Sequence, residues 1–192
     1  FYKTCMENGI KPLIGCEIYV VDNMKKREGK ESPNHLVLLA ENDEGLKNLY
    51  KIISLSHLEG FYFKPRTDKT LLSRYSKGLI ALSGCVKGKL PELILKGDID
   101  GAKTEAKSYM DIFGKDNFFL ELQYHGLPLE KKVNFWLLNM SKELKLDIVA
   151  TNDVHFIEKT DYTLHRVLMA VQTLSTVEEF PRYTTPEHYL KS

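Results

Sequence analysis

The stretch Asp147-Ile148-Val149-Ala150-Thr151-Asn152-Asp153-Val154-His155 decides the fold class of this chain. Its apolar part is short, rich in β-branched residues and bounded by polar ones, which predicts a buried central strand of an α/β sheet. Such folds place their chemistry at the carboxyl ends of their strands. In extended backbone Asp153 and His155 point to the same side and can share one metal ion. The alternative is a helix-capping aspartate and a surface histidine.

The composition is that of an ordinary globular domain. The chain has 192 residues, 43% of them hydrophobic and 28% charged, which allows a sizeable core. A formal net charge of +1 argues against binding nucleic acid through bulk charge, although a local basic patch is allowed. No stretch approaches the roughly 20 apolar residues of a membrane span, and no secretory leader opens the sequence, so we expect a cytoplasmic protein. Three cysteines without close spacing predict neither disulfides nor a structural zinc site.

Short apolar strands alternate with amphipathic helices along the chain. Strands are predicted within residues 12–21, 35–40, 78–83, 117–123 and 147–151. Helices are predicted from residue 42 through 53, over 99–113 and over 129–144, because apolar residues recur there at a spacing of three and four. This alternation predicts parallel strands covered by helices, as an open sheet or a barrel. A further helix around 162–169 carries His165 and is expected to be a packing helix.

Further side chains capable of binding metal lie in or beside the predicted strands. Glu17 lies in an apolar strand, where a carboxylate requires a cation or hydrogen-bond partners unless it faces solvent. His35 begins a strand and is either a ligand or a structural side chain. Cys85 follows Gly84, which allows a sharp turn, and is either a ligand or an inert buried thiol. His125 follows the strand within 117–123.

Carboxylates, imidazoles and a thiol drawn from several strand ends form a ligand set suited to zinc or manganese. Two or three metal ions held in this way hydrolyse phosphate esters, because they generate hydroxide from water and neutralise the developing oxyanion. The sequence contains no Gly-rich phosphate loop, Ser-His-Asp triad or dinucleotide-binding fingerprint that would favour another chemistry.

Five motifs in order resemble the polymerase and histidinol phosphatase (PHP) domain that opens the bacterial replicative DNA polymerase III alpha subunit. Matching five ordered motifs by chance is far harder than matching one. The resemblance extends to Tyr189-Leu190-Lys191-Ser192 at the end of the chain. The motifs are Ile14-Gly15-Cys16-Glu17-Ile18-Tyr19-Val20, His35-Leu36-Val37-Leu38-Leu39-Ala40, Glu59-Gly60-Phe61-Tyr62-Phe63-Lys64-Pro65-Arg66-Thr67-Asp68, Gly78-Leu79-Ile80-Ala81-Leu82-Ser83-Gly84-Cys85 and Ala150-Thr151-Asn152-Asp153-Val154-His155-Phe156.

The resemblance implies a distorted seven-stranded (β/α) barrel with a polynuclear zinc or manganese site at the carboxyl ends of its strands. The ligands carried over to this chain are Glu17, His35, Cys85, Asp153 and His155. The remaining ligands of the family lie upstream, in a His-x-His motif and an Asp-His strand end, and both are missing here. The chain also begins inside a helix that Gly9 ends in a left-handed conformation. We therefore expect residues 1–192 to be one incomplete PHP domain, with metal incomplete or absent and no activity of its own.

Basic segments are the candidates for contact with DNA or with other domains of such a polymerase. Lys64 and Arg66 follow aromatic residues on a predicted loop, although aromatic packing with solvated charges explains them equally well. His125 is a weaker candidate, because Tyr124 beside it departs from the family pattern. The Lys-rich segment 22–34 is expected to be a mobile surface loop, with direct contact to nucleic acid as the alternative.

Three functions remain open under this resemblance. The first is a metal-dependent 3′–5′ exonuclease domain of a replicative DNA polymerase, with DNA, other alpha-subunit domains and other replicase subunits as partners. The second is a structural and interaction module of that polymerase, which retains metal for stability. The third is a free-standing phosphoesterase of histidinol-phosphatase type. The family's carboxylates for nucleotidyl transfer lie far downstream, so no residue of this chain is assigned to polymerisation.

Overall fold

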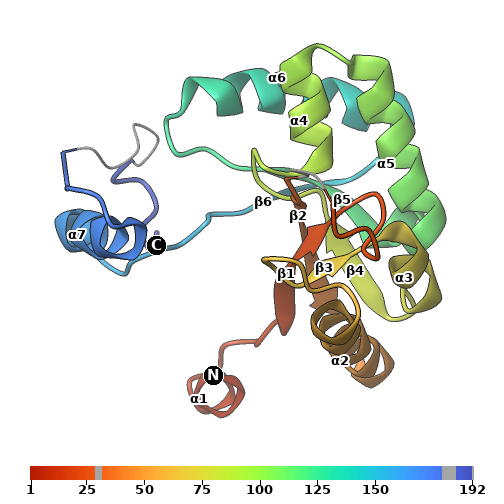
Figure 1. The fold of residues 1–192 in the computed structure, drawn as a ribbon, viewed down its shortest axis with the longest axis horizontal. Coiled ribbons are helices and arrows are strands. Elements are labelled where there is room, and N and C mark those ends of the chain that lie inside the picture. Colours follow the sequence, from red (N-terminus) through yellow and green to blue (C-terminus); the bar gives the residue numbers. More distant parts are fainter. Residues whose placement is uncertain (29–31, 179–184, 192) are drawn as a thin grey trace.

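The computed structural model describes residues 1–28, 32–178 and 185–191. A mixed, open sheet of six strands forms the centre of the fold, in the order β3-β1-β2-β4-β5-β6 (Figure 1). All five predicted strands are present, and only the two-residue β3 was not predicted. The strands are β1 (Gly15–Val20), β2 (Asn34–Ala40), β3 (Arg66–Thr67), β4 (Leu79–Leu82), β5 (Phe118–Leu122) and β6 (Ile148–Ala150).

Strand direction differs from the prediction of a parallel sheet. β2 is antiparallel to both β1 and β4, whereas the pairs β1–β3, β4–β5 and β5–β6 are parallel. Parallel neighbours need a long crossover connection, usually a helix. The connection between β1 and β2 has no helix among its described residues, so these two strands pair as neighbours running in opposite directions.

β6 is an edge strand, and the prediction of a buried central strand at this position is wrong. Its three residues pair with β5 on one side only, and Ile148 and Ala150 are both exposed. A short β-branched run predicts a strand, but its place in the sheet depends on which other strands pair with it. The residues that follow β6 lead away from the sheet toward α7 (Tyr162–Thr173) (Figure 1).

The three predicted helices form, each with a local signal at its start. The helix α2 (Asp43–Leu58) begins at Asn42, whose side chain accepts a hydrogen bond from the backbone N–H of Gly45. The helix α5 (Ile99–Phe113) is capped in the same way by Asp98, and α6 (Pro128–Leu144) has proline in its first turn. The helices α3 (Lys69–Arg74) and α4 (Lys89–Lys96) were not predicted.

The core lies on one face of the β1–β2–β4 region. The register aligns Ile18 with Leu36 and Leu38 with Ala81, and all four side chains are buried. They belong to one contiguous core with buried side chains of α2, α4, α5 and α6. Because side chains alternate along a strand, Glu17 and His35 lie on the opposite, less buried face. Glu17 and His35 therefore lie on one face of a sheet whose other face is covered by the hydrophobic core.

Two helices lie apart from the sheet (Figure 1). The first, α1 (Tyr2–Glu7), has no buried residue, and Gly9 beyond it has φ +69°, as its predicted left-handed conformation requires. Only Ala170 of α7 is buried, whereas Leu164 is 71% exposed, so the expectation that this helix packs is not met here. Among the described residues, none of the helices has the length and apolar character needed to cross a membrane.

Candidate metal centre

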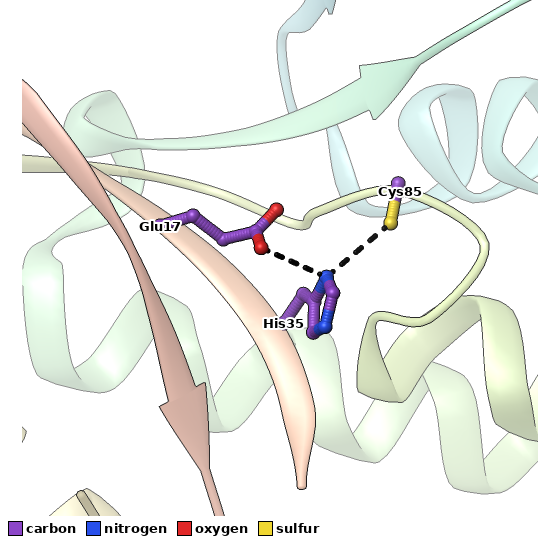
Figure 2. A group of neighbouring side chains, drawn as sticks. All are labelled: Glu17, His35 and Cys85. Atoms are coloured by element: carbon purple, nitrogen blue, oxygen red, sulfur yellow. Dashed lines mark hydrogen bonds and ion pairs between the residues drawn. The ribbon is translucent and has the colours of Figure 1, made fainter. Parts of the chain in front are cut away.

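A first cluster joins Glu17 on β1, His35 on β2 and Cys85 in the loop after β4 (Figure 2). Glu17 on β1 and His35 on β2 are diagonal neighbours on one face, close enough for long side chains to meet. His35 Nδ1 lies 3.1 Å from Glu17 Oε1 and 3.6 Å from Cys85 Sγ. One potential ligand atom from each residue lies within 4.8 Å of the others, so the cluster is compact enough to surround one metal ion.

Gly84 places Cys85 beside His35. Its φ of +81° is a left-handed conformation, and a Cβ at this position would lie 2.6 Å from the carbonyl oxygen of His35. Only glycine fits this turn without strain, as its position before Cys85 predicted. The backbone N–H of His35 also donates to the carbonyl of Lys87, 3.0 Å away, which fastens the loop after β4 to the start of β2.

The charges in this cluster stabilise one another. Hydrogen bonds to Cys85 and then to Glu17 raise the pKa of His35 to about 9, although burial opposes the shift. The hydrogen bond from His35 lowers the pKa of Glu17, and the charges of Lys87 and His155 contribute in the same direction. At neutral pH an imidazolium therefore lies between the carboxylate and the thiol, the place where a shared metal ion would be bound. A metal ion must displace this proton, so binding there competes with protonation of His35.

A second cluster joins Asp153, His155 and His188, whose ligand atoms also lie within 4.8 Å of one another. His188 was missed by the sequence reasoning, because it lies far along the chain in a turn-rich segment with no recognisable spacing. The backbone N–H of His155 donates to the carbonyl of His188 over 2.8 Å, which brings the two segments together. Burial lowers the pKa of His188, which favours its neutral, metal-binding form at neutral pH.

The five predicted ligands therefore lie in two groups rather than one. Three form the first cluster, and Asp153 and His155 form the second with His188. The two groups are near enough that the charge of His155 lowers the pKa of Glu17. The structure brings the predicted residues together in part, and their role as ligands stays a prediction.

Glu121 connects the two clusters, and the sequence reasoning did not identify it. Its carboxylate is buried and accepts a hydrogen bond of 3.0 Å from the backbone N–H of Gly84, next to Cys85. The other carboxylate oxygen accepts from the hydroxyl of Thr151, two residues before Asp153. The signal that could have revealed it is the one that identified Glu17, a carboxylate within an apolar strand.

Burial excludes two of the three residues predicted to contact DNA or another domain. Arg66 is 3% exposed, and its guanidinium donates to the carbonyls of Gly60, Met24 and Lys26. His125 is 1% exposed and paired with Glu130. Both side chains form hydrogen bonds with other residues of the chain, and a sequence pattern does not reveal such partners.

Lys64 is exposed, with its ammonium 4.3 Å from the centre of the Tyr19 ring, so it alone of the three stays available for such a contact. The Lys-rich segment is only partly a surface loop, because Met24 is buried in a small cluster with Val21 and Leu71. Residues 29–31 of this segment lie outside the described residues.

Comparisons with known proteins agree on one family. The model of the PHP domain family matches residues 1–125, which include Glu17, His35 and Cys85. DNA polymerase III subunit alpha of Deinococcus radiodurans is 40% identical, that of Thermus aquaticus 41% and that of Borreliella burgdorferi 42%, each over the whole of this chain. The chain spans only 15%, 16% and 17% of the length of these three relatives. The similarity to these relatives therefore also includes the second cluster.

Proposed function

The chain belongs to the PHP domain family, and from this membership we propose that it is part of a bacterial replicative DNA polymerase, the DNA polymerase III alpha subunit. The relatives that carry this name support the proposal over a free-standing phosphoesterase. Residues 1–192 form one PHP domain fragment of a cytoplasmic enzyme, and polymerisation takes place elsewhere in that enzyme. Its partners are DNA, the other domains of the alpha subunit and the other replicase subunits.

The intact domain, in this proposal, is a distorted seven-stranded (β/α) barrel. Two observations support it. The sheet is open, with β3 and β6 at its edges. In addition, the face of β1 and β2 that carries Glu17 and His35 is only partly buried, whereas the opposite face is core. A half-covered face with metal-binding side chains is what the interior of an incomplete barrel would present.

We propose that this face holds a polynuclear zinc or manganese site with 3′–5′ exonuclease chemistry. The observation that carries the proposal is the convergence of Glu17, His35 and Cys85 from two neighbouring strands and the loop after β4. Their carboxylate, imidazole and thiol suit zinc, and Asp153 and His155 add oxygen and nitrogen donors close by. Two or three such ions, when bound, activate water and offset the charge that builds on a phosphate ester.

Basic side chains near the first cluster suit a nucleic-acid strand as the substrate. The positive charge of Lys87 acts on Glu17, and Lys64 lies over the ring of Tyr19, which in turn contacts His35 edge to face. Both ammonium groups can attract the phosphates of a DNA strand toward the cluster without reading its sequence. Lys64 and Lys87 therefore bind and orient the DNA strand, while Glu121 holds in place the loops that carry Cys85 and Asp153.

The second candidate function is a structural module of the polymerase. It is favoured by the same convergence, because a metal ion at the first cluster would cross-link β1, β2 and the loop after β4. A metal that binds only the folded state adds its binding free energy to stability.

Nucleotide release separates the two candidates. The full-length alpha subunit that carries this domain should degrade the 3′ end of single-stranded DNA in a metal-dependent way. Cys85→Ala and Asp153→Asn should each reduce the rate by orders of magnitude, whereas His57→Gln, in a helix away from both clusters, should not. A polymerase-dead variant should retain the activity. If neither protein degrades the 3′ end, the nuclease proposal is wrong and the structural module remains.

Metal content tests the ligands themselves. In the full-length protein, Asp153→Asn combined with His155→Ala should remove most of the zinc or manganese found by elemental analysis, because each lost ligand weakens the rest of the set. Full occupancy in this double variant would show that these two residues are not ligands.

A further inference from the structure

A groove of about 410 Å³ opens beside the first cluster. Its lining includes His35, Lys64, Val86, Lys87, Leu95 and Lys96, and the three lysines are exposed. Glu92 is the one acidic side chain among the described lining residues, and its carboxylate is paired with Lys96 and, over 3.8 Å, with Lys89. This basic groove therefore carries an excess of positive charge next to His35.

Phe63 directly precedes Lys64, and so lies at the rim of the basic groove, in a strained conformation. Its φ is +58°, in the left-handed region that glycine adopts freely and a bulky residue does not. Its side chain is also 84% exposed, so a large apolar ring faces water. Both features cost free energy in the chain alone. Backbone strain of this kind is concentrated at sites that hold a ligand.

The turn that carries Phe63 is anchored to the fold. The backbone N–H of Tyr62 donates to the carbonyl of Lys64 over 3.0 Å, which closes the turn around Phe63. The guanidinium of the buried Arg66 lies 5.1 Å from the centre of the Tyr62 ring, and that ring contacts Phe63 at 4.6 Å, edge to face. An aromatic ring on an anchored turn loses little conformational entropy when it binds a ligand.

Aromatic and cationic side chains continue from Phe63 to the first cluster. The ammonium of Lys64 lies 4.3 Å from the centre of the Tyr19 ring, and that ring contacts His35 edge to face at 5.2 Å. Tyr19 and His35 are direct partners on β1 and β2, so their side chains share one face of the sheet. Aromatic rings combined with lysines along a groove are typical of sites for single-stranded nucleic acid, because the rings stack on bases and the lysines attract phosphates.

We propose that Phe63 is a stacking platform for a base of single-stranded DNA, and that the basic groove holds the phosphates between this base and the first cluster. This deepens the proposed function and rests on it in taking DNA as the substrate. In a duplex both faces of each base are already stacked on neighbouring base pairs. The platform therefore selects an unpaired strand over a duplex, although it does not distinguish one base from another.

Fluorescence anisotropy with a labelled thymidine oligonucleotide tests this in the 192-residue chain, in a chelator so that no metal ion contributes. Phe63→Ala should weaken binding roughly 5- to 150-fold, the usual cost of losing one stacked base, whereas Phe63→Trp should preserve it. Lys64→Gln and Lys87→Gln should each reduce the dependence of log affinity on log salt concentration by about 0.7, the value for one phosphate contact on a single strand. A duplex should compete poorly.

The matched controls are Tyr50→Ala and Lys77→Gln. Both side chains are exposed and neither lines the groove. Each variant should bind the oligonucleotide with wild-type affinity.

Phe63→Gly separates DNA binding from folding. Glycine adopts the left-handed conformation without strain, so this variant should unfold at no lower urea concentration than the wild type. It should nevertheless bind the oligonucleotide as weakly as Phe63→Ala. A large loss of stability in Phe63→Gly would mean that the ring serves the fold, and would overturn the proposal.

The remaining outcomes are equally decisive. Wild-type affinity in both Phe63→Ala and Phe63→Gly would refute the stacking role, and a wild-type chain that does not bind the oligonucleotide would refute the whole site. In the full-length alpha subunit, a photoreactive benzophenone side chain in place of Phe63 should form an adduct with the DNA strand. An adduct with protein alone would assign this ring to a protein contact instead.

The proposed nuclease activity can fail separately from this inference. Binding is measured without metal, so loss of affinity in Phe63→Ala combined with an alpha subunit that leaves the DNA 3′ end intact would refute the nuclease and support the platform. Metal-dependent degradation with unchanged DNA affinity in Phe63→Ala would refute the platform and support the nuclease.

Discussion

The two metal-binding clusters differ in what holds them. Glu17 and His35 lie on neighbouring strands, and the other face of those strands is the hydrophobic core. Asp153 and His155 follow an edge strand and meet His188 through a few backbone hydrogen bonds, with the exposed helix α7 beyond them. Ligands on a packed sheet are held in position before a metal ion binds. Ligands on two loops keep their positions only while the hydrogen bonds between those loops remain. The first cluster should therefore resist local unfolding better than the second.

The largest expected effect comes from the core behind the first cluster. Leu38 is fully buried on β2, and Leu38→Ala should lower the free energy of unfolding by about 2–5 kcal/mol, because it leaves a cavity. Leu168→Ala on α7, where the side chain is 65% exposed, should change it by less than about 0.5 kcal/mol. Urea unfolding of both variants measures the contrast. A loss of similar size for Leu168→Ala would mean that α7 is covered in solution.

The next effect concerns Glu121, which should act on both clusters at once. Glu121→Gln removes an oxygen that accepts from either Gly84 or Thr151, and should cost about 1–3 kcal/mol of unfolding free energy. Zinc affinity should fall by about 10–100-fold at each cluster, the usual effect of losing a residue that orients ligands. Calorimetric titration measures both affinities, with the exposed Glu41→Gln as the control. A loss confined to one cluster would show that Glu121 does not couple them.

The pH dependence of the first cluster follows from His35. Its pKa rises from 6.5 to about 9 on folding, so the folded state binds the proton more tightly. In the metal-free chain this contribution to stability is fully present below about pH 6.5 and is lost as the pH rises through about 9. Zinc affinity should rise over the same range, because the competing proton leaves.

Urea unfolding in the presence of a chelator, repeated from neutral to alkaline pH, measures the loss of stability. The variant His35→Gln should flatten that part of the profile. An unchanged profile in this variant would assign the pH dependence to another group.

The smallest effect is expected at the pairing that holds the second cluster. Asn152→Ala removes the side-chain hydrogen bond to the carbonyl of Tyr189 and should cost about 0.5–1.5 kcal/mol. Hydrogen exchange should become faster at the amides of His155 and Leu190, which bridge the two segments, but not at the amide of His35. Equal acceleration at His35 would show that the two clusters unfold locally together. That result would contradict the greater resistance to local unfolding expected for the first cluster.

The sequence by itself determined the local elements and the chemistry available to them. Short apolar runs placed five strands, a spacing of three and four residues placed three helices, and Gly84 marked a sharp turn. These signals are local, because each depends on residues within one element or next to it. The candidate ligands Glu17, His35 and Cys85 were also recognisable, since polar residues stand out in or beside apolar strands.

Only the tertiary structure decided how these elements combine. It set β1 and β2 antiparallel, placed β6 at an edge and buried Arg66 and His125. It also brought His188 to Asp153, 35 residues away along the chain, and used Glu121 to connect two strand ends. Strand partners, burial and such cross-chain contacts depend on which distant segments meet and exclude water together. That is a property of the whole packed chain, so no local pattern of residues contains it.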